Sequence, residues 1–173
     1  MFLHLRELLQ VGENPKVLEL FASPHVFQGL PELRESDAVL QEYVIPSFEP
    51  LASWTIYHQT NTPECRVRRV VWKRKTSVVL SPASSSTFGA DAVLRWSEIE
   101  GMLRELSEIS FPAFLADSCL GIDGTTFGIR RISFMSQSEA AWWNKAPPGW
   151  EKLGEWYESL IRFLELKLPE RTY

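Results

Sequence analysis

The chain has 173 residues, of which 45% are hydrophobic and 23% are charged, and its formal net charge is -4. These proportions exclude a disordered or fibrous protein. The acidic balance argues against wholesale attraction to nucleic acid or to an anionic membrane. No apolar run approaches the ~20 residues that span a bilayer. We therefore expect a single domain over residues 1–173 with no membrane partner.

The cysteine content and the N-terminus favour the cytoplasm. The two cysteines, Cys65 and Cys119, are too few and too far apart for a disulfide framework. The apolar N-terminus carries Arg6 and Glu7 and has no small-residue cleavage site, so it does not resemble a signal peptide. We expect a cytoplasmic protein.

The N-terminal third is predicted to be helical at first and then irregular. Apolar residues recur on one helical face over residues 2–11, and Gly12 predicts the end of that helix. Asn14 as a cap and Pro15 at the first helical position predict a second short helix. Residues 22–37 are rich in turn residues and predict a connection.

Alternating hydrophobicity begins near residue 39 and predicts strands. Residues 53–60 place Trp54, Ile56 and His58 on one face of a strand. The segment 65–80 is longer than the ~3–10 residues usual for a strand, so we expect two strands joined by a basic turn near residues 73–76. Residues 81–90 have the composition of a flexible loop.

The next predicted element is a helix that ends near residue 108. Ser97 and Glu100 match a capping box, in which each side chain satisfies a free amide of the first turn. The apolar side chains of this helix form one stripe, made of Ile99, Met102, Leu103 and Leu106.

The last third combines strands with a final helix. Asp123-Gly124 predicts a hairpin turn in which Gly124 has a positive φ, and a slip in the apolar phase predicts a bulge at Arg130-Arg131. A strand over 139–144 and a turn over 146–149 follow. The final helix carries an apolar stripe of Trp150, Leu153, Tyr157, Leu160, Ile161 and Leu164. Outside that stripe lie Glu151, Glu155, Glu158, Arg162 and Glu165.

These elements predict an α+β fold. We expect one mostly antiparallel sheet of about five or six strands, packed by the C-terminal helix and the middle helix. The N-terminal helices are expected at one end of the sheet.

The stretch AAWWNKAPPGW, residues 140–150, holds three of the seven tryptophans. Because neighbouring strand residues face opposite ways, Trp142 and Trp143 diverge, and only one of them enters the main core. The simpler interpretation, which we favour, is a lid over the core. The alternative is that Trp142 or Trp143 is an aromatic anchor for a partner.

One stretch resembles a known group of proteins. Gly121 to Arg130, then Trp142-Trp143, then Pro147-Pro148-Gly149-Trp150 before a terminal amphipathic helix, resembles small uncharacterised bacterial proteins. Some of these are presumed immunity or accessory proteins. The resemblance covers residues 119–173 and implies a non-enzymatic bacterial protein without assigning residue roles.

A basic cluster gives a second hypothesis. It contains six of the 18 basic residues within ten positions, leaving 12 basic against 22 acidic residues elsewhere. With one interleaved tryptophan, the cluster predicts contacts to phosphates and a stacked base. Its members are Arg66, Arg68, Arg69, Trp72, Lys73, Arg74 and Lys75. The alternative, which we prefer, is an exposed charged hairpin that protects a sheet edge.

Catalytic chemistry has weak support in the sequence. His58 is a candidate general base, with Asp117 or Asp123 to orient it and Cys119 as nucleophile, but no motif brings them together. The three histidines lack metal-ligand spacing, and no phosphate-binding motif is present, so no metal or cofactor is expected.

The leading hypothesis is therefore a non-catalytic bacterial binding protein, immunity- or accessory-like, whose partner is another protein. An acidic surface suited to a basic partner agrees with it. The alternatives are a small hydrolase-type enzyme around His58 and a nucleic-acid-binding module using residues 66–75. The oligomeric state does not follow from the sequence.

Overall fold

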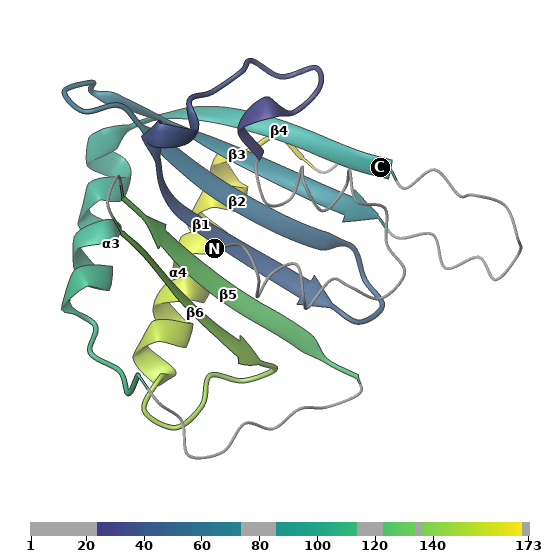
Figure 1. Cartoon of the computed structure of the whole chain (residues 1–173), viewed down its shortest axis with the longest axis vertical. Helices are drawn as coiled ribbons and strands as arrows, with labels where there is room; N and C mark the ends of the chain where they lie inside the picture. The colour runs from purple at the N-terminus through teal and green to yellow at the C-terminus, as the bar shows by residue number, and fades with distance from the viewer. Residues whose placement is uncertain (1–23, 74–85, 114–122, 134–135, 171–173) are drawn as a thin grey trace, which may run out of the picture.

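The computed structural model describes residues 24–73, 86–113, 123–133 and 136–170 (Figure 1). It confirms the α+β prediction: six strands form one sheet, and two α-helices pack on it. The strands are β1 (Ala38–Pro46), β2 (Leu51–His58), β3 (Glu64–Lys73), β4 (Ser86–Arg95), β5 (Thr125–Ile132) and β6 (Gln137–Trp143). The helices are α3 (Trp96–Glu108) and α4 (Glu151–Lys167), with short 3-10 turns η1 (Pro24–Val26) and η2 (Glu35–Asp37). The two helices predicted within residues 2–21 lie outside the described residues.

All neighbouring strands of the sheet are antiparallel, in the order β4-β3-β2-β1-β5-β6. The chain runs outward from β1 to β4 and then returns through α3 to lay β5 on the free side of β1 (Figure 1). The central strands are therefore β2 and β1, and β4 and β6 form the two ends of the sheet.

The side of the sheet that carries α3 and α4, the helix face, holds the apolar core. Trp54 and Ile56 alternate onto this face from β2, as predicted, and Ile129 and Trp142 reach it from β5 and β6. The predicted stripe of α4 packs against them: Leu153, Tyr157, Leu160 and Leu164 are all buried. The two helices also contact each other, since the Trp156 indole donates a hydrogen bond to the Met102 carbonyl at 2.8 Å.

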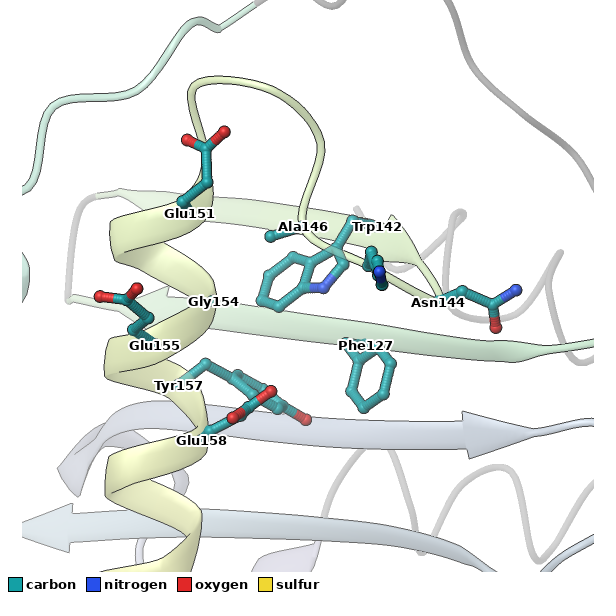
Figure 2. A pocket seen from close by; sticks show the side chains of 10 residues that line it. Phe127, Trp142, Asn144, Ala146, Glu151, Gly154, Glu155, Tyr157 and Glu158 are labelled. Carbon is teal, nitrogen blue, oxygen red and sulfur yellow. The ribbon is translucent and has the colours of Figure 1, made fainter.

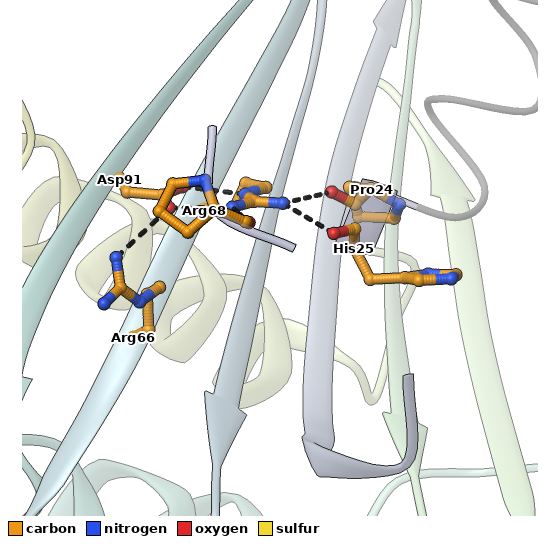
Figure 3. A network of polar contacts seen from close by, with 6 residues as sticks. Pro24, His25, Arg66, Arg68 and Asp91 are labelled. Atoms are coloured by element: carbon orange, nitrogen blue, oxygen red, sulfur yellow. Dashed lines mark hydrogen bonds and ion pairs between the residues drawn. The ribbon is translucent and has the colours of Figure 1, made fainter. Parts of the chain in front are cut away.

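On the opposite side of the sheet, the strap face, residues 24–37 form the N-terminal strap, which covers one end of that face (Figure 1). Arg68 of β3 is fully buried on this face and holds the strap in place (Figure 3). Its Nη1 donates to the carbonyls of Pro24 and His25, each at 2.9 Å, and its Nη2 donates to that of Pro31 at 2.6 Å. Asp91 of β4 neutralises the charge, with contacts of 2.7 and 2.8 Å.

Three local predictions are wrong. The capping carboxylate of α3 is Glu98, which accepts from the Arg95 amide at 3.2 Å, because the helix begins at Trp96 and not after Ser97. The pairing of β5 continues without a shift across Arg130 and Arg131, and the only irregularity of β1 with its neighbours lies between Ala38 and Leu40. Residues 86–90, expected in a loop, begin β4.

The role predicted for Gly124 is also wrong. Among the described glycines only Gly29 and Gly149 have positive φ. Gly124 instead exchanges hydrogen bonds with Ser47, and a Cβ at this position would lie 2.5 Å from the ring of Trp143. The glycine is therefore required by close packing, and the turn between β5 and β6 lies near Ser133 and Ser136.

One polar side chain is out of place in the core. Glu42 of β1 lies on the helix face between Trp54 and Ile129, is 1% exposed, and has no hydrogen-bond partner for either carboxylate oxygen. An unpaired buried charge is costly, so burial raises the pKa of Glu42 well above its ordinary value of 4.5. Burial therefore favours the neutral acid form of this side chain in the folded protein.

Glu42 makes the stability of the fold depend on pH. Because its pKa is higher in the folded than in the unfolded chain, its contribution is fully present below about pH 4.5 and is lost as the pH rises towards the folded-state pKa. We expect the free energy of unfolding of Glu42→Gln to rise relative to that of the wild type from about pH 4.5 upward, by at most about 1.4 kcal/mol per pH unit. Urea unfolding of both proteins between pH 4 and 9 measures this. If the free energies of unfolding of the two proteins changed equally with pH, this prediction would be contradicted.

Two helical glycines provide a matched pair. A Cβ on Gly101 of α3 would meet no atom within 4 Å, whereas a Cβ on Gly154 of α4 would lie 2.8 Å from the Cβ of Ala146. We expect Gly101→Ala to raise the free energy of unfolding by about 0.5–1 kcal/mol through helix propensity. Gly154→Ala should lower it, because the chain at Ala146 must move. If denaturant unfolding showed that both variants gain the same free energy of unfolding, Ala146 would not rest on α4.

Candidate binding pocket

Two consecutive tryptophans of β6 face opposite sides of the sheet, as predicted. Trp142 is 7% exposed and belongs to the helix-face core, where its ring meets that of Trp150 edge-on at 6.2 Å. Trp143 lies on the strap face over Gly124 and is half-buried. Trp150 is also buried, and its indole donates to the Pro112 carbonyl at 2.9 Å. The lid interpretation is thus correct for Trp142 and Trp150.

The turn after β6 is fixed against both β5 and α4. Asn144 adopts a positive φ of 57°, and its amide donates to the Thr125 carbonyl while its Oδ1 accepts from the Thr125 amide, both at 2.8 Å. Gly149 has a φ of +87° and leads into α4, which confirms the predicted turn. Ala146 rests on Gly154, the one position of this part of α4 that has no side chain.

Between this turn and α4 lies a pocket of about 240 Å³ (Figure 2). Its lining comes from β5, β6, the turn and the first half of α4. The lining residues are Phe127, Trp142, Asn144, Lys145, Ala146, Glu151, Gly154, Glu155, Tyr157 and Glu158. The volume is below the ~300–1,000 Å³ of cofactor and drug-sized sites, so the pocket suits a single side chain or a small molecule.

Three aromatic rings make the apolar part of the pocket. Trp142 stands edge-on to Tyr157 with ring centroids 5.2 Å apart, and Phe127 lies nearly parallel to Trp142 at 6.0 Å. The Tyr157 hydroxyl donates to the Tyr43 carbonyl at 2.7 Å and so points away into the core. Burial raises the pKa of Tyr157, which keeps it a neutral phenol. The rings are fixed by packing before any ligand arrives.

The polar part of the pocket is acidic. Glu151, Glu155 and Glu158 are exposed and follow one face of α4 at helical spacing, against a single lysine, Lys145. Glu151 accepts a hydrogen bond from the Gly149 amide at 2.9 Å, and backbone hydrogen bonds lower its pKa. No ion pair of Glu155, Glu158 or Lys145 is found within the described part of the chain.

The sequence located part of this pocket. It named Trp142 and Trp143 as candidate anchors and favoured the one outside the main core, which the structure shows to be Trp143, and it placed the three glutamates outside the stripe of α4. It missed Phe127 and Tyr157, because their convergence depends on β5 being laid beside β1. Trp143, the other predicted anchor, does not line the pocket.

The predicted basic cluster is dispersed within the fold. β3 is an interior strand, so the expected exposed edge hairpin is not what residues 66–73 form. Arg68 is bound to the strap, and Arg69 is 4% exposed, with Nη1 2.7 Å from Glu165. Trp72 is buried. Arg66 contacts Asp91, Lys73 is exposed, and Arg74 and Lys75 lie outside the described residues.

His58 lies far from Asp123, the one proposed catalytic partner that the structure describes. It ends β2, whereas Asp123 precedes β5 at the opposite end of the sheet, and Asp117 and Cys119 lie outside the described residues. The ring of His58 stacks on Trp96 at 3.7 Å, and its Nε2 is 3.1 Å from the Thr62 carbonyl oxygen. These contacts are those of a histidine used for packing at the rim of the core.

Sequence reasoning missed that the strand partner of His58 is Cys65. A cysteine beside a histidine is the pair used in thiol catalysis. Here, however, burial raises the pKa of the Cys65 thiol to about 11, and the side chain is 3% exposed. The thiol is therefore neutral and inaccessible, unlike an activated nucleophile.

Comparisons with models of protein families, with curated proteins and with solved structures returned no match. In the described part of the chain, no three His, Cys, Asp or Glu side chains are grouped so that they could hold a metal ion. Each helix described is too short or too polar to span a bilayer.

The three tryptophans of residues 140–150 should differ in their effect on stability. We expect Trp150→Ala and Trp142→Ala each to cost about 3–5 kcal/mol, because both remove a ring from the core. Trp143→Ala should cost at most about 2 kcal/mol, because this ring is only half-buried. Denaturant unfolding ranks the variants, and losses at Trp143 as large as at Trp142 would contradict the assignment.

Proposed function

We propose that this chain is a non-catalytic binding protein of the bacterial cytoplasm, immunity- or accessory-like, that recognises another protein through the pocket beside Trp142. The resemblance of residues 119–173 to small bacterial proteins motivates the class. The pocket supplies the surface: rigid aromatic rings next to three exposed carboxylates. Such a combination is typical of interface sites, where aromatic anchors give affinity and charges select the partner.

One observation carries the proposal: aromatic rings held in place by packing lie in the same pocket as carboxylates that form no ion pair with any described residue. On α3, exposed glutamates such as Glu100 and Glu105 do not line this pocket. On α4, Glu155 and Glu158 stand at the mouth of a cavity with Trp142 and Phe127 inside it. A partner that inserts there gains buried apolar contact and charge pairing together.

The other two hypotheses have less support. A nucleic-acid site at residues 66–75 would need exposed, unpaired arginines, whereas Arg68 and Arg69 are buried in ion pairs. An enzyme around His58 would need a partner base or nucleophile, and its nearest strand partner is the inert thiol of Cys65.

We expect charge reversal at the pocket to abolish partner capture. Wild-type protein and the double variant Glu155→Arg/Glu158→Arg are immobilised and exposed to lysate of the organism that encodes the chain. A partner that uses the pocket should be recovered at least tenfold less on the variant. The matched control is Glu100→Arg/Glu105→Arg on α3, which makes the same change of charge on the other helix.

The outcome depends on comparing the three samples by quantitative mass spectrometry. A protein lost on the α4 variant and kept on the α3 variant supports the proposal. Recovery of the same set of proteins on all three, with circular dichroism showing folded variants, would rule the pocket out as the partner surface.

A further inference from the structure

The indole nitrogen of Trp142 differs from those of the three other tryptophans buried in the helix-face core. Trp54 donates from Nε1 to Glu165 at 2.7 Å, Trp150 to the Pro112 carbonyl at 2.9 Å, and Trp156 to the Met102 carbonyl at 2.8 Å. The Trp142 side chain is buried to a similar degree, yet its Nε1–H donates to no acceptor in the described part of the chain, and the nitrogen atom itself is not fully buried and so is open to solvent. Buried indoles usually find an acceptor.

This donor belongs to the wall of the pocket and faces the side of Phe127, whereas Glu151 and Glu155 lie along α4 on the other side (Figure 2). A ligand that fits must therefore offer two things at once. It must carry an oxygen acceptor for Trp142 Nε1–H and a cation for the carboxylates of Glu155 and Glu158. Within a polypeptide, a basic residue meets both conditions, because its main-chain carbonyl accepts and its side chain is cationic.

We infer that the pocket binds one arginine side chain of the partner protein. This inference rests on the proposed function and names the group that is recognised. The planar guanidinium stacks on aromatic rings and pairs with carboxylates through a fixed fork of donors, so it matches a pocket that has both. A lysine ammonium is more strongly hydrated and gains less from ring contact.

The charges at the pocket also exclude an anion as the occupant. The N-terminal end of α4 already carries a carboxylate, that of Glu151, which accepts a hydrogen bond from the amide of Gly149 just before the helix. Lys145 is the only cation among the lining residues, against three carboxylates. An acidic ligand would face net repulsion at the mouth of the pocket.

The direct test uses the full chain labelled with ¹⁵N at its tryptophan indoles, and the probe N-acetylarginine N-methylamide. The signal of Trp142 is identified as the one missing from Trp142→Phe. The probe should shift this signal in a saturable way, with a dissociation constant on the order of 1 mM. The citrulline analogue, which has the same shape without the charge, should bind at least tenfold more weakly, and the lysine analogue severalfold more weakly.

The variants separate the carboxylates from general charge. Glu155→Gln/Glu158→Gln should weaken arginine binding at least tenfold, whereas Glu100→Gln/Glu105→Gln on α3 should leave it within about twofold. Equal binding of arginine and citrulline probes, tighter binding of lysine, or no saturable shift up to about 50 mM arginine probe would overturn the inference.

Failure here differs from failure of the proposed function. If partner capture is lost with the α4 charges but the arginine probe does not bind, the pocket is an interface that recognises a different group. If the probe binds as expected but capture does not depend on Glu155 and Glu158, the arginine site stands and the proposed partner surface is wrong.

Discussion

The whole structure depends on the buried guanidinium of Arg68. All five of its N–H groups are used: Nε and Nη2 by Asp91, Nη1 by the carbonyls of Pro24 and His25, and Nη2 also by that of Pro31. A buried charge is tolerated only when it is paired and fully hydrogen-bonded, and these contacts meet both conditions. They join β3, β4 and the N-terminal strap, so a polar network covers one end of the strap face, opposite the apolar core of the helix face.

Covering the strap face in this way determines which surface remains for binding. A second charged contact fixes the C-terminal end of α4, since Glu165 accepts from Arg69 and from the Trp54 indole, each at 2.7 Å. The N-terminal end of α4 is held by Trp150, which is bonded to the Pro112 carbonyl. Between these two anchors, Glu155 and Glu158 on the outer face of α4 form no ion pair with any residue that the structure describes, and they lie beside the pocket. The helix is thus rigid where recognition is proposed.

The sequence predicted the elements whose hydrophobic pattern is local and missed the contacts that cross the fold. Alternation found β2, and the 3.6-residue stripe found α4. Arg68 could not be recognised as buried, because its partner Asp91 lies 23 residues further on and its other acceptors are strap carbonyls. Glu165, expected in solvent, turns to Arg69 for the same reason. The pocket combines residues of β5, β6 and α4. The periodicity of hydrophobic residues along the chain predicts single strands and helices but not the order in which strands pair.

Trp142 belongs both to the core and to the pocket, and this couples binding to stability. Its ring touches Trp150, Tyr157 and Phe127, which join β5, β6 and α4, and the same residue lines the pocket. A ligand that accepts a hydrogen bond from the Trp142 Nε1–H binds only when the turn is seated on α4, because Gly154 and Ala146 form the adjoining wall. Occupancy therefore stabilises the folded state by mass action, in proportion to the logarithm of ligand concentration above its dissociation constant. The pocket and the core thus share one set of ring contacts around Trp142, and these contacts are already formed in the absence of a ligand.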